Sequence, residues 1–413
     1  MRRASRRVAV ALCALAVTLG ITTPPALAGA AGSLPKLLGV GPPSSSQVSF
    51  WAGENFLPNG TRDLSVYTPA LWALLAHDRV PIYLNLRYRY DFAAPVGQAD
   101  AGTALSIIQQ ANSHGVPVWA WIVVPSNDGY YAWQGNASEQ LAAEQALRSW
   151  QDANHLTLAG VAFDPEPPGQ WYSAFYGALA GTGAAGFAQL ETRTIDPAAQ
   201  CASIVQYNAV YNWASSHFAG VVAAPWPVAV DDVLDSGTIA LQSATGYWGL
   251  PRGAQALYFQ AYRSVFADIF GVDPGSSLVA SYFERARHLL GAVRGQVTLG
   301  VAGDSTYKTL APLVNDVRLV AALGASSIPI YSLEYAVQAY GLSGVEQLVQ
   351  AGHNPLAHRI AEQQARPSPQ SLAISSAIRA LVAGVVMATP AVTASRGAPQ
   401  LPNLYPEGCG GSE

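Results

Sequence analysis

The sequence predicts a (β/α)8 barrel, and three features of the chain lead to this fold class. Short runs of apolar, β-branched and aromatic residues recur eight times between residues 48 and 334. Polar loop residues and then a helical segment follow most runs, which is the order of a repeated βα unit. The runs are almost continuously apolar, as in parallel strands buried on both faces. A doubly wound open sheet is the rival fold, but residues 50–54 (FWAGE) lack the glycine-rich turn that many such sheets carry after their first strand.

The expected elements follow one another along the chain. The expected strands are Val48–Ala52, Pro81–Leu86, Pro117–Val124, Gly160–Asp164, Gly220–Ala224, Ala256–Tyr262, Gln296–Val301 and Ile328–Glu334. The helices expected between them include Thr103–Ser113, Glu139–Asn154, Ala199–His217, Ser277–Arg294 and Thr309–Leu323. The barrel is therefore assigned to residues 47–365.

Residues 1–28 have the features of a secretory signal peptide. Arginines precede an apolar run over residues 8–21, and residues 26–28 (ALA) offer a small-residue cleavage site. We therefore expect export, to an extracellular or cell-wall location. Residues 29–46 are expected to be a linker and residues 366–413 a C-terminal tail. The apolar core of the tail, residues 380–388, is too short to span a bilayer, so we expect no membrane span after processing and favour a helix docked on the barrel.

The charge balance excludes several classes of partner. The 413 residues are 50% hydrophobic and only 12% charged, whereas soluble proteins average roughly 25% charged residues. Removing the four signal-peptide arginines from the totals of 22 basic and 26 acidic residues leaves a net charge of −8. An acidic chain without a basic stripe is not suited to nucleic acid or to an anionic membrane surface. The oligomeric state and the pairing of Cys201 with Cys409 stay open.

The end of the fourth expected strand is the most informative part of the sequence. Residues 160–166 read GVAFDPE, and strand alternation puts Asp164 and Glu166 on the same side as the small Gly160 and Ala162. Two carboxylates on one face repel each other, so one of them is expected to hold a proton near neutral pH. A protonated Glu beside a hydrogen-bonding Asp is the arrangement that a general acid needs. The alternative is a solvated strand end before a Pro-Pro turn.

Three short motifs stand at or near the ends of the fourth, sixth and eighth strands. They are Asp164-x-Glu166, Gln260-x-Tyr262 and the aromatic-Ser-Leu-Glu sequence of residues 331–334. Together they resemble the plan of family 18 chitinases and related barrel glycoside hydrolases. The resemblance implies that Glu166 is the general acid, that Asp164 orients an acetamido group of the substrate, and that Tyr262 supports an oxazolinium intermediate.

The second catalytic carboxylate stays open, because the chain departs from that family. Ala159 and Ala162 stand where the family has further aspartates, and Tyr331 replaces its usual tryptophan. The alternative to substrate-assisted chemistry is a nucleophile or base from another strand end, for which the candidates are Glu334, Asp304 and Glu54. The separation of the two carboxyl groups would then indicate retention at about 5–5.5 Å or inversion at about 6.5–9.5 Å.

The aromatic content fits a sugar ligand. The chain has 10 Trp and 19 Tyr, several of them at strand ends or in the loop of residues 128–133. Flat side chains stack on the apolar faces of sugar rings, although ordinary core packing is the alternative for each of them. The candidate binding residues are Trp51, Glu54, Arg87, Trp121, Trp226, Gln260, Asp304 and Tyr331. Arg87 either clamps an anionic substituent or pairs with Asp91, and pairing is preferred.

Neither a metal nor a cofactor is expected. The histidines fall on expected helices or loops and not at strand ends, and the nucleophilic G-x-S-x-G sequence does not occur. Two functions remain. One is a secreted glycoside hydrolase that cleaves a cell-envelope or environmental polysaccharide by carboxylate chemistry. The other is a catalytically inactive barrel that binds glycan or cell-wall polymer.

Overall fold

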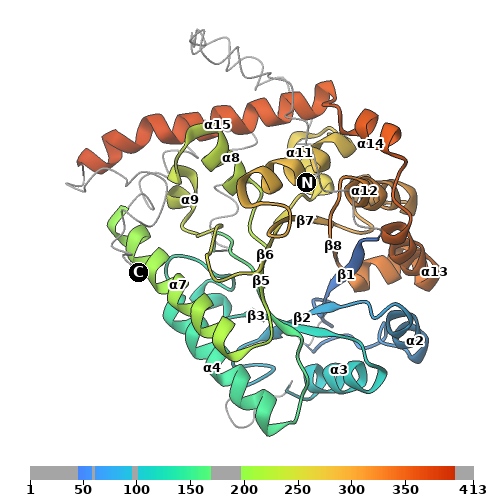
Figure 1. The fold of residues 1–413 in the computed structure, drawn as a ribbon. Helices are drawn as coiled ribbons and strands as arrows, with labels where there is room; N and C mark the ends of the chain where they lie inside the picture. The colour runs from blue at the N-terminus through green and yellow to red at the C-terminus, as the bar shows by residue number, and fades with distance from the viewer. Residues whose placement is uncertain (1–44, 58–60, 95–100, 169–196, 396–413) are drawn as a thin grey trace.

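Eight parallel strands close into a barrel in the computed structural model, and helices surround it (Figure 1). The structure describes residues 45–57, 61–94, 101–168 and 197–395. The strands pair in chain order, and β1 closes the barrel against β8. The strands are β1 Gln47–Ala52, β2 Ile82–Arg87, β3 Val118–Val123, β4 Gly160–Phe163, β5 Val221–Ala223, β6 Ala256–Gln260, β7 Gly295–Gly300 and β8 Ser327–Tyr331. Each overlaps its expected run, and the predicted (β/α)8 barrel is confirmed.

The helices surrounding the barrel include all five that the sequence predicts, here α3, α4, α7, α11 and α12. The described helices are α2 Pro69–His77, α3 Ala101–His114, α4 Ala137–Ala153, α7 Pro197–His217, α8 Val228–Ser236, α9 Ala240–Thr245, α10 Arg263–Phe270, α11 Ser276–Leu290, α12 Leu310–Ala322, α13 Leu333–His353, α14 His358–Ala365 and α15 Pro369–Ser395. Cys201, in α7, is disulfide-bonded. Cys409, whose pairing with Cys201 the sequence left open, lies outside the described residues.

Two expected strands end earlier than the sequence suggested, because a helix begins at once. β6 ends at Gln260, and Tyr262 is the N-cap residue of α10. β8 ends at Tyr331, and Glu334 lies in the first turn of α13 after the N-cap residue Ser332. An acidic side chain is favoured in the first turn of a helix. The last residues of these apolar runs therefore belong to helix starts, which changes the direction of their side chains.

Aromatic side chains fill the interior of the barrel. At the end of the barrel where the strands begin, the indole ring of Trp119 lies over Gly160 and Gly220. A Cβ atom added to Gly160 would come within 2.3 Å of this ring, and one added to Gly220 would come within 2.5 Å. The small residue expected at position 160 is thus required by a neighbouring Trp. A buried cluster above it includes Trp51, Tyr83, Trp121, Val222 and Tyr258. The barrel is therefore a packed core, and the chemistry is confined to the ends of the strands.

The C-terminal helix α15 packs across α8 and α9, on the outside of the barrel (Figure 1). Ile374, Ile378, Val382 and Val385 are buried and recur at the spacing of one helix face. This is the docked helix that the sequence favoured. Within the described ranges, no helix is both long enough and apolar enough to cross a membrane. The expected signal peptide lies outside these ranges.

Candidate functional site

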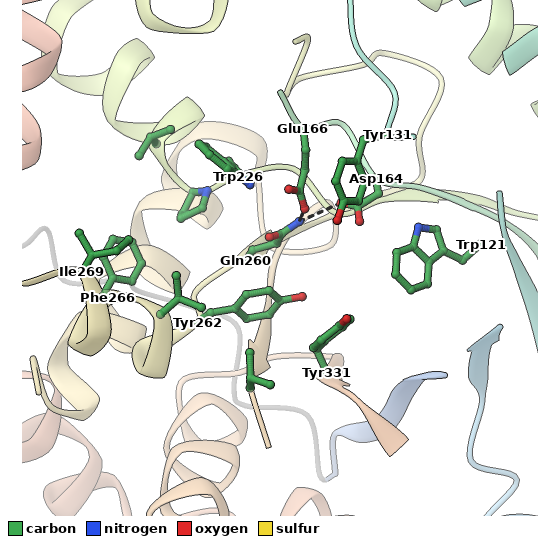
Figure 2. Close-up of a pocket in the computed structure, with 14 residues that line it drawn as sticks. Trp121, Tyr131, Asp164, Glu166, Trp226, Gln260, Tyr262, Phe266, Ile269 and Tyr331 are labelled. Carbon is green, nitrogen blue, oxygen red and sulfur yellow. Dashed lines mark hydrogen bonds between the residues drawn. The ribbon is translucent and has the colours of Figure 1, made fainter. Parts of the chain in front are cut away.

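Asp164 and Glu166 follow β4 and meet Gln260, the last residue of β6. Gln260 Nε2 donates hydrogen bonds to Asp164 Oδ1 at 2.8 Å, to Glu166 Oε1 at 2.5 Å and to the carbonyl oxygen of Ala224 at 2.8 Å. Both carboxyl groups are buried, with residue exposures of 7% and 6%. Figure 2 shows the two carboxylates converging on the amide nitrogen. The alternative in which Asp164 and Glu166 form a solvated strand end is therefore wrong.

Burial raises the pKa of both carboxyl groups. The pKa of Asp164 lies well above its usual range because of burial and, next, because of the negative charge of Glu166. Burial also raises the pKa of Glu166, to about 7. Hydrogen bonds from the side chains of Gln260, Asp164 and Trp226 lower this pKa but do not outweigh the effect of burial. Burial is the first cause of the raised pKa in both groups, so the pair retains a proton near neutral pH, as expected from two carboxyl groups on one face.

The carboxylate pair forms part of the wall of a cavity of about 320 Å³. Side chains from six of the strand ends meet there. The candidates from the sequence that line it are Trp121, Asp164, Glu166, Trp226, Gln260, Tyr262 and Tyr331. In Figure 2, Trp121 stands at one side of the carboxylates, and Trp226 stands at the other. The structure thus brings together the three residues to which the resemblance gave catalytic roles.

Glu54 does not line the cavity and is linked to it through Tyr331. Glu54 Oε1 accepts hydrogen bonds from Tyr130 Oη at 3.1 Å and from Asn85 Nδ2 at 3.4 Å, and Oε2 accepts one from the Tyr331 hydroxyl. Burial raises the pKa of Glu54 to about 7, and the charge of Glu166 contributes to the rise. Glu54 therefore holds Tyr331 in place at the cavity wall, and its pKa depends on whether Glu166 is ionised.

Glu334 and Asp304, the other two candidates for a second carboxylate, have different contacts. Glu334 is 1% exposed, and its Oε1 accepts hydrogen bonds from Gly53 N and Tyr67 Oη, each at 2.5 Å. Asp304 is exposed and accepts a hydrogen bond from Ser305 N at 2.7 Å, as the N-cap of a short 3-10 helix. Neither lines the cavity. The expectation that one of them supplies the second carboxylate has no support in this geometry.

Trp51 is a packing residue, which corrects its assignment as a ligand contact. It is 1% exposed, lies against Tyr83 with ring centroids 4.7 Å apart, and donates from Nε1 to Thr298 Oγ1 at 3.1 Å. It supports Trp121 from below the cavity, with ring centroids 5.1 Å apart. Strand alternation correctly placed Trp51 inside the barrel, but alternation gives no information on the depth of a side chain along the barrel axis.

Arg87 pairs with Asp91, as the sequence favoured, and its alternative role in binding substrate is not supported. Arg87 Nη2 lies 3.0 Å from Asp91 Oδ1. Arg62 makes a second, fully buried ion pair with the same carboxylate at 2.9 Å. Burial alone would raise the pKa of Asp91, but the two guanidinium groups bring it below its usual range.

Several cavity residues were not identified from the sequence. Tyr131 lies in the aromatic loop that the sequence singled out, and burial raises the pKa of its hydroxyl well above 10. An apolar part of the wall comes from α10, through Val265, Phe266 and Ile269. Their helical spacing directly after β6 was the available signal. These three residues lie on a helix beyond the strand end, where strand alternation does not predict which side chains face the site.

The arrangement offers a buried proton donor beside flat aromatic walls. With pKa values raised by burial, the carboxylate pair holds at least one proton at neutral pH. In the part of the chain that the structure describes, no group of three or more His, Cys, Asp or Glu residues is placed to hold a metal ion. Such a site can donate a proton to an uncharged ligand that stacks on aromatic rings.

Comparison with known proteins gives matches to solved structures at low sequence identity. No protein-family model matches the chain, and no curated protein matches it. Among solved structures, a family 18 chitinase from Pseudoalteromonas aurantia is 14% identical, with a TM-score of 0.41, over 73% of this chain and 100% of that one. The catalytic domain of a β-amylase from Paenibacillus polymyxa is 11% identical, with a TM-score of 0.43, over 77% and 100%. An exo-β-1,4-mannosidase from Opitutaceae bacterium strain TAV5 is 12% identical, with a TM-score of 0.42, over 83% and 60%.

Proposed function

We propose that this protein is a glycoside hydrolase in which Glu166 is the general acid. The observation that carries the proposal is the buried Asp164–Gln260–Glu166 group in the wall of an aromatic-lined cavity. A carboxyl group with a pKa of about 7 is protonated in a useful fraction of molecules near neutral pH. That property suits proton transfer to a leaving oxygen.

Glu166 donates its proton to the glycosidic oxygen while the bond from that oxygen to the anomeric carbon breaks. The leaving group departs as an alcohol, and positive charge develops on the sugar ring. Water then adds to the anomeric carbon and returns a proton to the Glu166 carboxylate, so the cycle closes. Trp121 and Tyr331 provide flat surfaces for the sugar, and Gln260 fixes the orientation of the acid.

The group that stabilises the anomeric carbon is the substrate's own acetamido group in this proposal. The cavity-lining carboxylates of the described chain both lie at the end of β4, and neither faces the other across the cavity. Asp164 orients the acetamido group, and the Tyr262 hydroxyl supports the cyclic intermediate. Glu54, held behind Tyr331, is the alternative if the substrate lacks an acetamido group.

The natural substrate is proposed to be a cell-envelope or environmental polysaccharide, reached by export of the mature chain. The warrants are the signal-peptide features of residues 1–28 and the acidic charge of the remainder. Detection of the mature protein in culture medium or cell-wall fractions, with an N-terminus near residue 29, tests this part. Retention of an uncleaved chain in the cytoplasm would contradict it.

The decisive experiment is a screen for release of reducing sugar from chitin, peptidoglycan and arabinan. We expect Glu166→Gln to lower the rate at least about 100-fold, the usual contribution of a general acid. Glu362→Gln changes a well-exposed carboxyl group away from the cavity and is the matched control. Equal rates for wild type and Glu166→Gln would remove Glu166 from the mechanism. Binding of a polymer without cleavage would favour the inactive glycan-binding barrel.

A further inference from the structure

The cavity extends from the carboxylates to an apolar part that we call the α10 wing. The α10 wing consists of Trp226, Val228, Val265, Phe266, Ile269 and Val301. These side chains come from the chain after β5, from α10 and from the chain after β7. In Figure 2, Phe266 and Ile269 lie on the side of Glu166 opposite to Trp121. Val265 and Ile269 are only partly buried, so the wing is not sealed by its own packing.

Polar groups of the α10 wing already have partners. The Trp226 side chain hydrogen bonds to Glu166. The Val301 amide donates to Ser264 Oγ at 2.6 Å, and Ser264 is fully buried. The other side chains that form the wing are hydrocarbon. A sugar ring placed there would bury several hydroxyl groups without protein partners, and each would cost roughly 1–3 kcal/mol.

The opposite half of the cavity differs in chemistry. Trp121, Tyr131, Tyr262 and Tyr331 offer rings with polar edges, and Asp164 and Gln260 offer hydrogen-bonding groups. This half can therefore satisfy the hydroxyl groups of a sugar. Glu166 lies between the two halves, at the place where a general acid must reach the oxygen that joins a sugar to its leaving group.

Resting on the proposed function, we infer that the α10 wing binds an apolar leaving group. The substrate class is a polysaccharide or shorter glycan whose sugar at the cleaved bond occupies the aromatic half and whose leaving group is an alkyl or aryl alcohol. Glu166 transfers its proton to the aglycone oxygen as the bond to the anomeric carbon breaks, and the alcohol leaves through the wing. Water supplies the hydroxyl group that replaces it. The cavity volume, near the lower end for small-molecule sites, fits such a compact ligand.

The test measures binding in the Glu166→Gln variant, in which turnover is expected to be at least about 100-fold slower. Methyl and n-hexyl N-acetyl-β-D-glucosaminide share one sugar, which carries the acetamido group, and differ only in the length of the apolar group. Each buried methylene favours binding by about fourfold, so we expect the hexyl glycoside to bind at least about tenfold more tightly in calorimetry. Adding Ile269→Asn is expected to remove this difference. Adding Ile360→Asn, at an isoleucine that is 48% exposed on α14, is the matched control and is expected to preserve it.

The outcomes separate this inference from the proposed function. Equal affinities for the two glycosides, with Glu166-dependent cleavage in the polysaccharide screen, overturn the inference alone. A hexyl preference that Ile269→Asn leaves intact also overturns it, because the apolar contact then lies elsewhere. A hexyl preference without cleavage of any glycoside by wild type refutes the proposed function, and with it the assignment of the wing to a leaving group. For the sugar identified in the screen, kcat/KM is expected to rise with alkyl length in wild type and in Ile360→Asn but not in Ile269→Asn.

Discussion

Replacement of Glu166 by Gln is expected to change how stability depends on pH, without any substrate. Burial raises the pKa of Glu166 from 4.5 to about 7 in the folded protein. The folded state therefore binds this proton more tightly than the unfolded state. The resulting stabilisation is complete below pH 4.5 and is lost as the pH rises through 7. At roughly 1.4 kcal/mol per pH unit, the loss amounts to about 3 kcal/mol.

Glutamine has no proton to lose, so the Glu166→Gln variant lacks this loss. Urea unfolding of both proteins at pH 4.5 and pH 8 gives the comparison. The variant is expected to gain about 3 kcal/mol relative to wild type between the two pH values. Buried carboxyl groups whose raised pKa values do not depend on Glu166, such as Asp232, are common to both proteins and cancel in the difference. The charge of Glu166 also raises the pKa of Asp164, so its removal adds to the gain in the variant.

Parallel pH curves for wild type and Glu166→Gln would refute this reasoning. They would mean that Glu166 titrates alike in the folded and unfolded states, which contradicts its burial beside Asp164. Glu362→Gln, at an exposed position, is expected to follow wild type at both pH values. A shift in that variant as well would point to a general charge effect.

Three further predictions concern the residues around the site. Trp226→Phe keeps an aromatic ring but removes the indole N–H that stabilises the ionised form of Glu166. The pKa of Glu166 should therefore rise, and the basic limb of the pH profile of kcat/KM should move up by roughly one pH unit or more. An unchanged basic limb would exclude the hydrogen bond between Trp226 and Glu166. Gly220→Ala should destabilise the barrel by about 1–3 kcal/mol in denaturant unfolding, because the added Cβ meets the indole ring of Trp119. Adding Trp119→Leu should relieve much of that cost. If the free-energy changes of the two substitutions simply add, the clash is not the cause. Asp91→Asn should lower the free energy of unfolding by about 3–5 kcal/mol, because it leaves the Arg62 guanidinium group buried without its charge partner. A small change in thermal stability would instead show that water reaches the ion pair.

The strands were predictable because burial on both faces imposes a local pattern on the sequence. Continuous apolar runs mark each strand, and alternation within them gave the correct side for Asp164 and Glu166. The need for a small residue at position 160 followed from the same alternation. Those inferences depend on a few neighbouring residues, and that information is present in one sequence.

Residues just beyond the strand ends were less predictable, because a turn resets the direction of the chain. Gly53 has a φ of 87°, and the following Glu54 points to Tyr331 and not into the cavity. Glu334 follows β8 by three residues but belongs to a helix, where it holds Gly53 and Tyr67. The directions of these side chains are set by contacts with residues far away in the chain, which alternation cannot reveal.

The position of Trp119, at the end of the barrel where the strands begin, has a kinetic consequence. With the indole ring seated over Gly160 and Gly220, the interior offers no passage from one end to the other. Ligand entry and the departure of both products then share the upper end. In the proposed mechanism the alcohol is released first, while the sugar still occupies the aromatic half. Free sugar in solution is therefore expected to compete with incoming substrate, so turnover will slow as product accumulates.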